Sequence, residues 1–540
     1  MVAPLRGGGS GWTKGTSRAP LSHPNAVKAP VVAVAQWGSR ACRVVTLLAF
    51  GLLQAGCAPE PRHSIRFGLA TAPINLDPRY ATDAISDRIT RLLFARLVDF
   101  DPQFQPITSL ASWRVLTPSR YRFVLGHRWR RFHDGHRLTA KDVQATYASV
   151  LQGPVASPHR RALSIIQRIE VLDEDTVEFY LQRSDPLFPG RLGIGILPAR
   201  LIAKNHPFNS RPVGSGPLKL LAWPTPGWLV LERPADGQRI EFHTAQDPTV
   251  RVLKLLKGEI DLFQGDIPYE LEAWLAQRKE VRLSRVSGTT MNYLGFNLRD
   301  PVVAEPLVRQ AIAHAIDRDA IIRYVLKGAA RKAASVLPPE HWAGYRGADS
   351  PAYDPERAQS LLQQAGYSDA RPLGIIYTTS NNPFRVRLAT IIQYQLAKVG
   401  IRTEIRSYDW GTLYADIKAG RFQMYSLSWV GLKIPDIFRY AFHSSALPPV
   451  GANRGRFSSR LADRLIEAAE QSEDPAEQAR LYLRLQSHLL EQLPYVPLWY
   501  EDVSLVARRG LTPYRLAADG NYDGLIAIRW GKDGARIAAN

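Results

Sequence analysis

The part of the chain that most constrains the fold is segment 355–429, where helical and strand patterns alternate. The strand patterns are LGIIYT, IRTEIRS and FQMYSLSW, and each follows a helical pattern. The helical patterns end in Gly366, Gly400 and Gly420, each placed where a left-handed C-cap residue is favoured. Strands separated by helical patterns of roughly ten to fifteen residues indicate βαβ units. We therefore predict an α/β fold with a mainly parallel sheet in this segment.

Chain length adds a second constraint, because 540 residues exceed what one compact core organises. The composition is that of a globular protein, with 45% hydrophobic residues, 22% charged residues and 12 tryptophans. This composition excludes wholesale disorder and supplies enough apolar side chains for more than one core. We expect two or more domains.

The net charge of +20 is distributed in a way that argues against a nucleic-acid interface. Residues 1–57 hold six basic side chains and no acidic one, and the rest of the chain has 63 basic and 49 acidic residues. Beyond residue 57 the basic side chains are scattered, mostly as single arginines among apolar residues. A diffuse basic surface is typical of a soluble protein, or of one near an anionic membrane. We predict no nucleic-acid partner.

Segment 40–57, RACRVVTLLAFGLLQAGC, has the order of a secretory signal: two arginines, an apolar run of ten residues, then small residues. That apolar run is too short to span a bilayer. Because the segment ends in Ala-Gly-Cys57, it resembles a bacterial lipoprotein signal, in which the cysteine is lipidated and becomes the first mature residue. Gln54 departs from the lipoprotein pattern, so an ordinary cleaved signal with an incidental cysteine stays open.

Both cysteines of the chain, Cys42 and Cys57, lie in this leader, so the predicted mature body has none. A cysteine-free body excludes a disulfide framework, a cysteine zinc site and a thiol nucleophile. It suits an oxidising compartment, in which stray thiols are a liability. Together with the signal, this absence predicts a protein of the bacterial cell envelope.

Residues 128–147, RWRRFHDGHRLTAKDVQATY, place His133 and His136 three residues apart. The dipeptide Asp134-Gly135 between them is favoured in tight hairpin turns. A zinc site needs three or four ligands, and no cysteine or compact His/Glu motif supplies the others. We expect a scaffold turn and no metal site here, followed by a helix that Thr139 caps.

The sequence also lacks the common catalytic motifs. It contains no Gly-x-Ser-x-Gly elbow, no His-Glu-x-x-His pair and no Gly-x-x-x-x-Gly-Lys phosphate loop. A pair of catalytic carboxylates brought together by the fold stays open, although a solvated surface acid is the common case. We predict a protein that is not an enzyme and holds no cofactor.

Six blocks, in the same order, resemble the solute-binding proteins of ABC importers, in extracellular family 5 of peptide- and nickel-binding type. The blocks are GLATAPINLDP, LASWRVLTPSRYRFVLGHRWRRFHDGHRLTAKDVQATY, PVGSGPLKL, LLKGEIDLF, FNLRDPVVAEPLVRQAIAHAIDRDAII and LPYVPLWY. The resemblance covers essentially the whole predicted mature chain. It implies the type II periplasmic-binding-protein fold (cluster C), with two α/β lobes joined by a hinge and a small accessory subdomain.

The resemblance also implies domain limits and a function. Residues 1–57 form the leader, lobe I comprises 58–100, 212–291 and 494–540, the accessory subdomain is 101–211, and lobe II is 292–493. The implied protein is a periplasmic, monomeric receptor for peptides or peptide-like solutes, anchored through lipid on Cys57, which delivers its ligand to an inner-membrane permease. A sensor or regulatory protein, or a receptor for haem, nickel or opine-like solutes on the same fold, stays open.

In peptide-binding relatives, a Trp and a Gly after a strand precede an aspartate that pairs with the α-amine of the peptide. Here Trp429 and Gly431 match, but Leu432 occupies the aspartate position. Because burying an ammonium without a counter-charge is costly, we predict a blocked or longer peptide, or a solute without a free amine. Asp436 is either a substitute acceptor or the N-cap of the next helix. The remaining candidate ligand-binding residues are Asn297, Tyr293 and Thr71.

Overall fold

The computed structural model describes residues 64–155, 157–347 and 351–531. The predicted leader, with Cys57, lies outside the described residues. Within the described ranges, no helix combines the length and the apolar character that crossing a membrane requires.

One sheet of 11 strands extends through the described chain, in the order β15-β14-β16-β12-β17-β11-β1-β10-β9-β8, with β13 paired to β17. Its strands are β1 (Ser64–Leu69), β8 (Lys219–Thr225), β9 (Trp228–Arg233), β10 (Gln238–Thr244), β11 (Leu262–Gln264), β12 (Val281–Phe296), β13 (Ala330–Lys332), β14 (Leu373–Ser380), β15 (Ile401–Tyr408), β16 (Met424–Trp429) and β17 (Tyr495–Arg508). β14 is parallel to both β15 and β16, which confirms the βαβ prediction for segment 355–429. The sheet as a whole is mixed, because β8, β9 and β10 follow one another through tight turns that produce antiparallel pairs.

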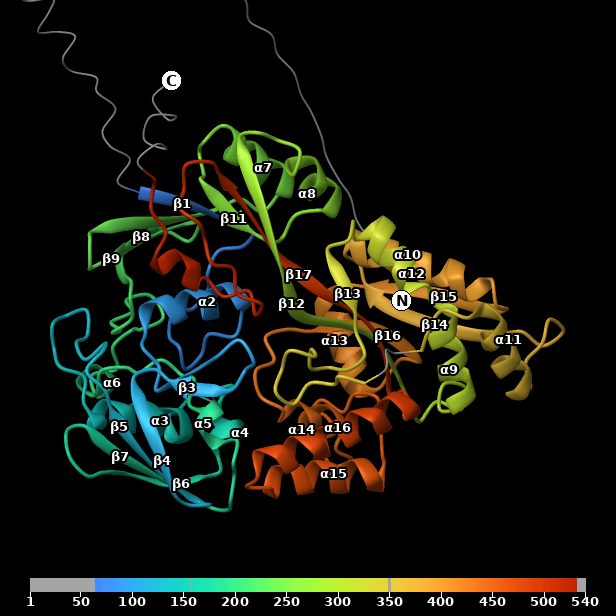
Figure 1. Ribbon diagram of the computed structural model, residues 1–540, viewed down its shortest axis with the longest axis horizontal. Helices are drawn as coiled ribbons and strands as arrows, with labels where there is room; N and C mark the ends of the chain where they lie inside the picture. The colour runs from blue at the N-terminus through green and yellow to red at the C-terminus, as the bar shows by residue number, and fades with distance from the viewer. Residues whose placement is uncertain (1–63, 156, 348–350, 532–540) are drawn as a thin grey trace, which may run out of the picture. The chain divides into compact units, whose positions relative to one another are not determined.

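The long strands β12 and β17 join the two halves of this sheet (Figure 1). They pair antiparallel over most of their length, and their register shifts between Val286 and Thr290. Gly288 lies within this irregularity, and a Cβ there would come 2.1 Å from the carbonyl oxygen of Glu501 in β17. Irregularities of this kind bend and twist a strand. The two halves therefore meet at a bend in two closely paired strands.

The helices begin and end much as the sequence indicates. They are α2 (Ala84–Leu93), α3 (Ala140–Gln152), α4 (Arg160–Leu163), α5 (Phe188–Arg191), α6 (Ala199–Ile202), α7 (Pro248–Leu256), α8 (Tyr269–Leu275), α9 (Pro306–Ala315), α10 (Arg318–Ala320), α11 (Pro355–Gln364), α12 (Pro383–Ala397), α13 (Trp410–Ala419), α14 (Ile437–Phe442), α15 (Arg460–Gln471) and α16 (Pro475–Gln492), with a π-helical turn η1 (Ile321–Val325) and a 3-10 turn η2 (Asp523–Ile526). Gly366, Gly400 and Gly420 have φ angles of 84°, 89° and 83°, which confirms the left-handed ends predicted for α11, α12 and α13.

The histidine-containing stretch forms the predicted turn. Gly135 has a left-handed backbone (φ 90°), and Thr139 caps α3 in a reciprocal arrangement with Asp142. The backbone N–H of His133 donates to Gly214 O at 2.7 Å, and its Nε2 lies 3.1 Å from Gly216 O. His133 therefore fastens the turn to the glycine-containing segment 214–216, as a scaffold residue would.

A smaller antiparallel sheet is formed by two strands before this turn and two strands after it, in the order β4-β5-β7-β6. Its strands are β4 (Ala111–Thr117), β5 (Arg120–Leu125), β6 (Ile166–Val171) and β7 (Thr176–Leu181), and a separate pair is formed by β2 (Val98–Phe100) and β3 (Pro106–Thr108). Phe123, Phe179 and Tyr147 of α3 pack edge to face in the core beneath it. The predicted accessory subdomain thus contains a sheet with an apolar core of its own.

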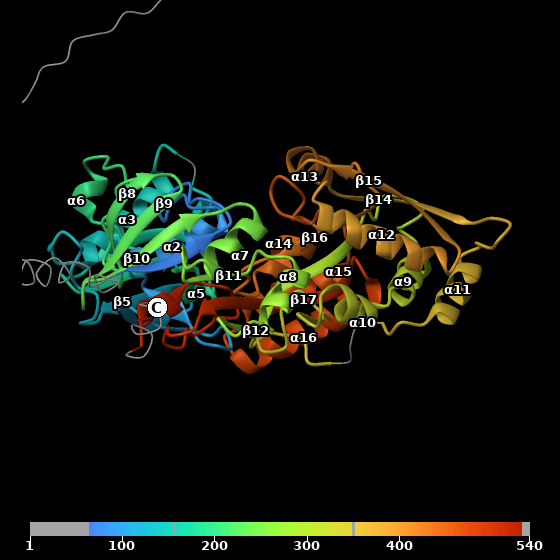
Figure 2. The same ribbon diagram turned by 90° about the horizontal axis from the view of Figure 1, so that it is seen from above.

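Two further cores lie on opposite faces of the sheet around β12, because alternate residues of a strand point to opposite faces. Leu294 and Phe296 pack into a core with α9, α11 and α12, whereas Met291 and Tyr293 pack into a core with α13, α14, α15 and α16. Figure 2 shows α12 and α13 on opposite sides of this part of the sheet. This arrangement brings the end of β16, where the predicted site begins, to the second of these cores.

Candidate functional site

The predicted ligand-binding loop, residues 430–436, follows β16 and precedes α14. Trp429, the last residue of β16, lies opposite Met291 of β12 and stacks on Tyr293, with ring centroids 6.3 Å apart and planes 13° apart. Gly431 has a left-handed backbone, with φ of 69°. The structure thus brings together three of the predicted site residues, Trp429, Gly431 and Tyr293, in one place.

Arg454 supports this aromatic group and was missed by sequence reasoning. Its guanidinium carbon lies 4.8 Å from the centroid of the Trp429 ring, a distance at which a cation is attracted to the face of the ring. Its Nη1 also donates to the hydroxyl of Tyr293 at 3.2 Å. Tyr293 is fully buried and stacks on Tyr495 at 4.1 Å. The hydroxyl of Tyr293 therefore accepts a hydrogen bond from within the protein, and its ring packs against the ring of Trp429.

Asn297 lies at the opposite end of β16 from Trp429, where its backbone N–H donates to Gln423 O. Its side-chain amide donates to the carbonyls of Gly420 and Phe422, each at 3.1 Å. Asn297 therefore holds the connection between α13 and β16, and the structure does not bring it to the ligand-binding loop. The last predicted residue, Thr71, is exposed in the loop after β1.

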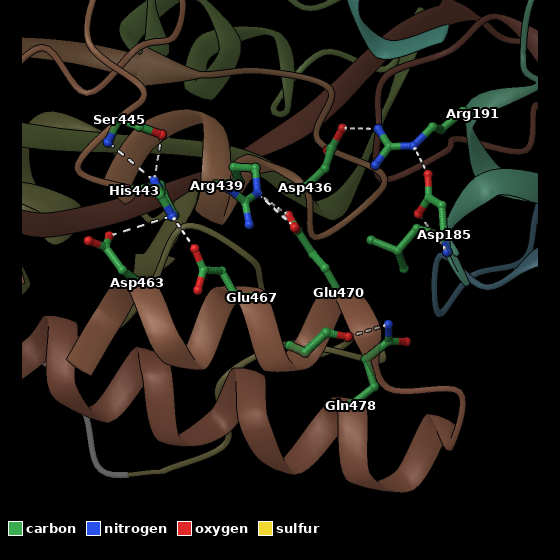
Figure 3. A network of polar contacts seen from close by, with 12 residues as sticks. Asp185, Arg191, Asp436, Arg439, His443, Ser445, Asp463, Glu467, Glu470 and Gln478 are labelled. Atoms are coloured by element: carbon green, nitrogen blue, oxygen red, sulfur yellow. Dashed lines mark hydrogen bonds and ion pairs between the residues drawn. The ribbon is translucent and has the colours of Figure 1, made fainter. Parts of the chain in front are cut away.

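Asp436 stands directly before α14, but its side chain accepts no hydrogen bond from the first turn of that helix. Its carboxylate instead accepts a hydrogen bond from Arg191 Nη1 at 2.8 Å, and Arg191 Nε donates to Asp185 at 2.7 Å (Figure 3). Burial raises the pKa of Asp436, and the guanidinium of Arg191 opposes this shift. The carboxylate predicted as an amine acceptor or a cap is thus paired with an arginine of α5.

Lys433 ties the loop to the C-terminal segment through Asp519, with an Nζ to Oδ2 distance of 2.7 Å. The same carboxylate accepts a hydrogen bond from the backbone N–H of Asn521 at 3.1 Å. Although burial acts to raise it, Lys433 and this N–H lower the pKa of Asp519 to about 2. Sequence reasoning did not find this pair, because no local pattern relates residues so far apart in the chain.

A buried histidine holds the same loop through its backbone. His341 has no exposed surface, and its Nδ1 accepts a hydrogen bond from Ala343 N at 3.0 Å. Its Nε2 therefore carries the proton and donates to Lys433 O at 3.1 Å. Burial lowers the pKa of His341 to about 4, which keeps the ring neutral near pH 7.

A cavity of about 340 Å³, which we call the loop cavity, lies beside the loop. Its lining residues are Pro78, Asp87, Thr90, Arg91, Arg96, Val98, Asp99, Phe100, His159, Ala162, Gly190, Arg191, Gly193, Ile194, Gly195, Gly431, Leu432, Lys433, Ile434 and Asp436. Gly431 and Asp436 of the predicted set lie in this lining, and most of the other lining side chains come from residues 78–195. The cavity is rich in charged groups of both signs.

A second cavity, of about 460 Å³, adjoins the first and has a different character. Half of its lining residues are aromatic or proline, including Trp113, Tyr121 and Trp342, and we call it the aromatic cavity. The two cavities share Gly190 and Ile434, and a Cβ at Gly190 would come 2.8 Å from Ile434 Cγ2. A cavity with several aromatic side chains beside one with placed polar groups suits the binding of a small solute.

Known proteins that resemble this chain share its length and its fold. It is 29% identical over 512 residues to di/tripeptide-binding protein 2 of Pseudomonas aeruginosa, covering 87% of this chain and 95% of that protein. It is 26% identical over 486 residues to the dipeptide-binding protein of Escherichia coli, covering 82% of this chain and 90% of that protein.

Among solved structures, the periplasmic binding protein DppA from Helicobacter pylori in complex with the peptide STSA is 26% identical, with a TM-score of 0.72. The alignment covers 87% of this chain and 98% of that one. The substrate-binding protein CtaP from Listeria monocytogenes has the same fold, with a TM-score of 0.78 at 22% identity over 87% of this chain and 99% of that one. The sequence model of the bacterial extracellular solute-binding proteins, family 5 (middle), matches residues 111–446. The chain therefore belongs to family 5 of the bacterial extracellular solute-binding proteins.

Proposed function

We propose that this chain is the receptor of an ABC importer and binds a peptide or a peptide-like solute, which it delivers to a permease in the inner membrane. The observation that carries the proposal is the loop after Trp429, which lines a cavity together with residues 78–195. Similarity to proteins named for dipeptide and tripeptide binding, over most of both chains, supports the ligand class. We propose a monomer that binds without catalysis.

The mode of binding is proposed to differ from an amine clamp. Leu432 packs against the core that contains Tyr293, and it offers no charge to an ammonium group. Asp436, in the loop, and Asp519, which contacts Lys433 of the loop, are each paired with a cation. A free α-amine that reached either of these two acids would have to displace its cation. We therefore propose a solute without a free amine, or a blocked or longer peptide.

Isothermal titration with a di- and tripeptide library, each peptide in free-amine and N-acetyl form, tests this mode. We expect the wild type to bind both forms within about threefold, and Leu432→Asp to prefer the free amine by at least about tenfold, or 1.4 kcal/mol. Leu432→Asn is the matched control, because it has a similar size and no charge. Tight binding that acetylation abolishes in the wild type would refute the mode, and its loss in Asp436→Asn would assign the amine to Asp436.

The two-lobe division is proposed with the limits that the resemblance implies, 58–100, 212–291 and 494–540 for lobe I and 292–493 for lobe II. The bend at Gly288 in the paired strands β12 and β17 supports this division. A separate core lies on each side of the bend. Closure about these strands would transmit ligand binding to the permease. Small-angle scattering with and without a bound peptide tests it, and an unchanged radius of gyration would contradict closure.

Membrane attachment through lipid on Cys57 is proposed from the leader sequence alone. A single acyl chain anchors weakly, so we expect a modification with several chains. Cells expressing wild-type or Cys57→Ser protein are fractionated with detergent, and the wild type is expected in the membrane fraction. An equal distribution of the two proteins would favour a simple cleaved signal.

A further inference from the structure

One arginine of the loop cavity, Arg96, has only a distant counter-charge among the residues that the structure describes. Arg96 lies between α2 and β2, and its side chain is 12% exposed. The carboxylate that approaches it is that of Asp87, whose Oδ1 is 3.9 Å from Arg96 Nη2, beyond hydrogen-bond distance. Its Nε is buried and meets no hydrogen-bond acceptor among the residues that the structure describes. A buried guanidinium in this position is costly, because its Nε has given up water without gaining a hydrogen-bond acceptor.

The other cations of the same lining are differently placed. Arg91 lies 2.6 Å from Asp99 and 2.7 Å from Asp523. Arg191 has Asp185 and Asp436 at 2.7 and 2.8 Å, and Lys433 has Asp519 at 2.7 Å. Each of these three cations has a carboxylate within hydrogen-bond distance. Arg96 therefore differs from the other cations of this cavity in having no carboxylate within hydrogen-bond distance among the described residues.

Because Arg96 lines the loop cavity together with Gly431, a solute that enters this cavity lies beside Arg96. A guanidinium presents parallel N–H groups that match the two oxygens of a carboxylate. We propose that Arg96 is an anion subsite and binds a carboxylate of the solute. This inference rests on the proposed function, and it specifies the ligand as acidic.

The electrostatics of the site agree with this assignment. Burial lowers the pKa of Arg96, and the neighbouring Arg91 lowers it further. Asp87, Asp99 and Asp523 act in the opposite direction without restoring the ordinary value. The positive charge of Arg96 is thus only partly balanced in the protein alone, and an anionic group of the ligand would add the missing negative charge.

Isothermal titration with matched peptides tests the subsite. The probes are N-acetylated di- and tripeptides, each as the free acid and as the C-terminal amide, with inorganic phosphate as a separate anion. We expect the wild type to bind the acid at least about tenfold more tightly than the amide, and Arg96→Met to lose this preference. Arg161→Met is the control, because Arg161 is exposed on α4 and does not line the cavity, and it should keep the preference.

The melting temperature of the ligand-free protein gives a second and independent measurement. Replacing an uncompensated buried cation with an apolar side chain of similar length removes a cost, so Arg96→Met should melt at a higher temperature than the wild type. A structural arginine would show the opposite change. A lower melting temperature, or a variant that does not fold, would therefore overturn the inference.

The remaining outcomes separate this inference from the proposed function. If peptides bind but acid and amide bind equally, or if Arg96→Met keeps the preference, the carboxylate subsite is wrong and the receptor function stands. If inorganic phosphate displaces a bound peptide and acid and amide do not differ, the carboxylate assignment is likewise wrong. If no peptide of either form binds the wild type, the peptide ligand of the proposed function is wrong. A lower melting temperature of Arg96→Met would separately refute the under-compensated charge.

Discussion

The ion pair between Lys433 and Asp519 makes a prediction whose size follows from the structure. The pKa of Asp519 falls from its ordinary value of 3.8 to about 2, which corresponds to about 2 kcal/mol of stability at neutral pH. The side chain of Asp519 is 11% exposed and that of Lys433 is 24% exposed, so solvent screens this pair less than it screens a surface pair. We expect Asp519→Asn to lower the free energy of unfolding by about 2 kcal/mol at pH 7.

The pH dependence of this difference has a definite sign. The folded-state pKa lies below the unfolded-state value, so the contribution is fully present above about pH 4 and is lost as the pH falls towards 2. Chemical denaturation of the wild type and Asp519→Asn between pH 7 and pH 3 should show the two stabilities converging at low pH. Asp369→Asn is the control, because Asp369 is exposed. A variant as stable as the wild type at pH 7, or a difference that does not change with pH, would refute the reasoning.

Three further substitutions test other contacts around the loop and the bend. Burial lowers the pKa of His341 to about 4, below its unfolded value of about 6.5, so the stability of the protein should fall as the pH decreases through this range. His341→Gln should reduce this dependence of the melting temperature on pH, and an unchanged dependence would contradict the prediction. Gly288→Ala brings a Cβ within 2.1 Å of a backbone oxygen of β17 and should cost roughly 1–3 kcal/mol in denaturation experiments, whereas Gly374→Ala in β14, with open space around it, should cost less. Arg454→Met removes the cation 4.8 Å from the Trp429 ring and should lower stability by roughly 2–3 kcal/mol and shift tryptophan fluorescence; an unshifted spectrum would contradict the stacked arrangement.

Sequence reasoning predicted local structure where the signal is local. The glycines that end α11, α12 and α13, and the Asp134-Gly135 turn, have the left-handed backbone that their patterns indicate. Thr139 caps α3 for the same reason, since its partner lies three residues along the chain. The resemblance singled out Trp429 and Gly431 from their local spacing on β16 and its loop, and Gly431 lines the loop cavity.

Long-range contacts were beyond that reasoning. The amide of Asn297 looks available in the sequence, but the fold uses it to hold two carbonyls more than a hundred residues away. Asp436 looks like a helix cap, but an arginine 245 residues earlier in the chain takes its carboxylate. Arg96 lies in an ordinary apolar stretch, and only the packed structure shows that its charge has no close partner.

These contacts together determine what the loop after Trp429 can recognise. His341, Asp519 and Arg191 hold the loop from three separate segments, so its conformation is set largely by groups outside it. An amine clamp requires an acid that is free to accept, and the acids that hold this loop, Asp436 and Asp519, are each occupied by a cation. Arg96 is the arginine of the loop cavity that has no carboxylate within hydrogen-bond distance among the described residues. A solute that binds Arg96 as we propose brings a negative charge. The replacement of the aspartate by Leu432 and the distant counter-charge of Arg96 favour the same class of ligand.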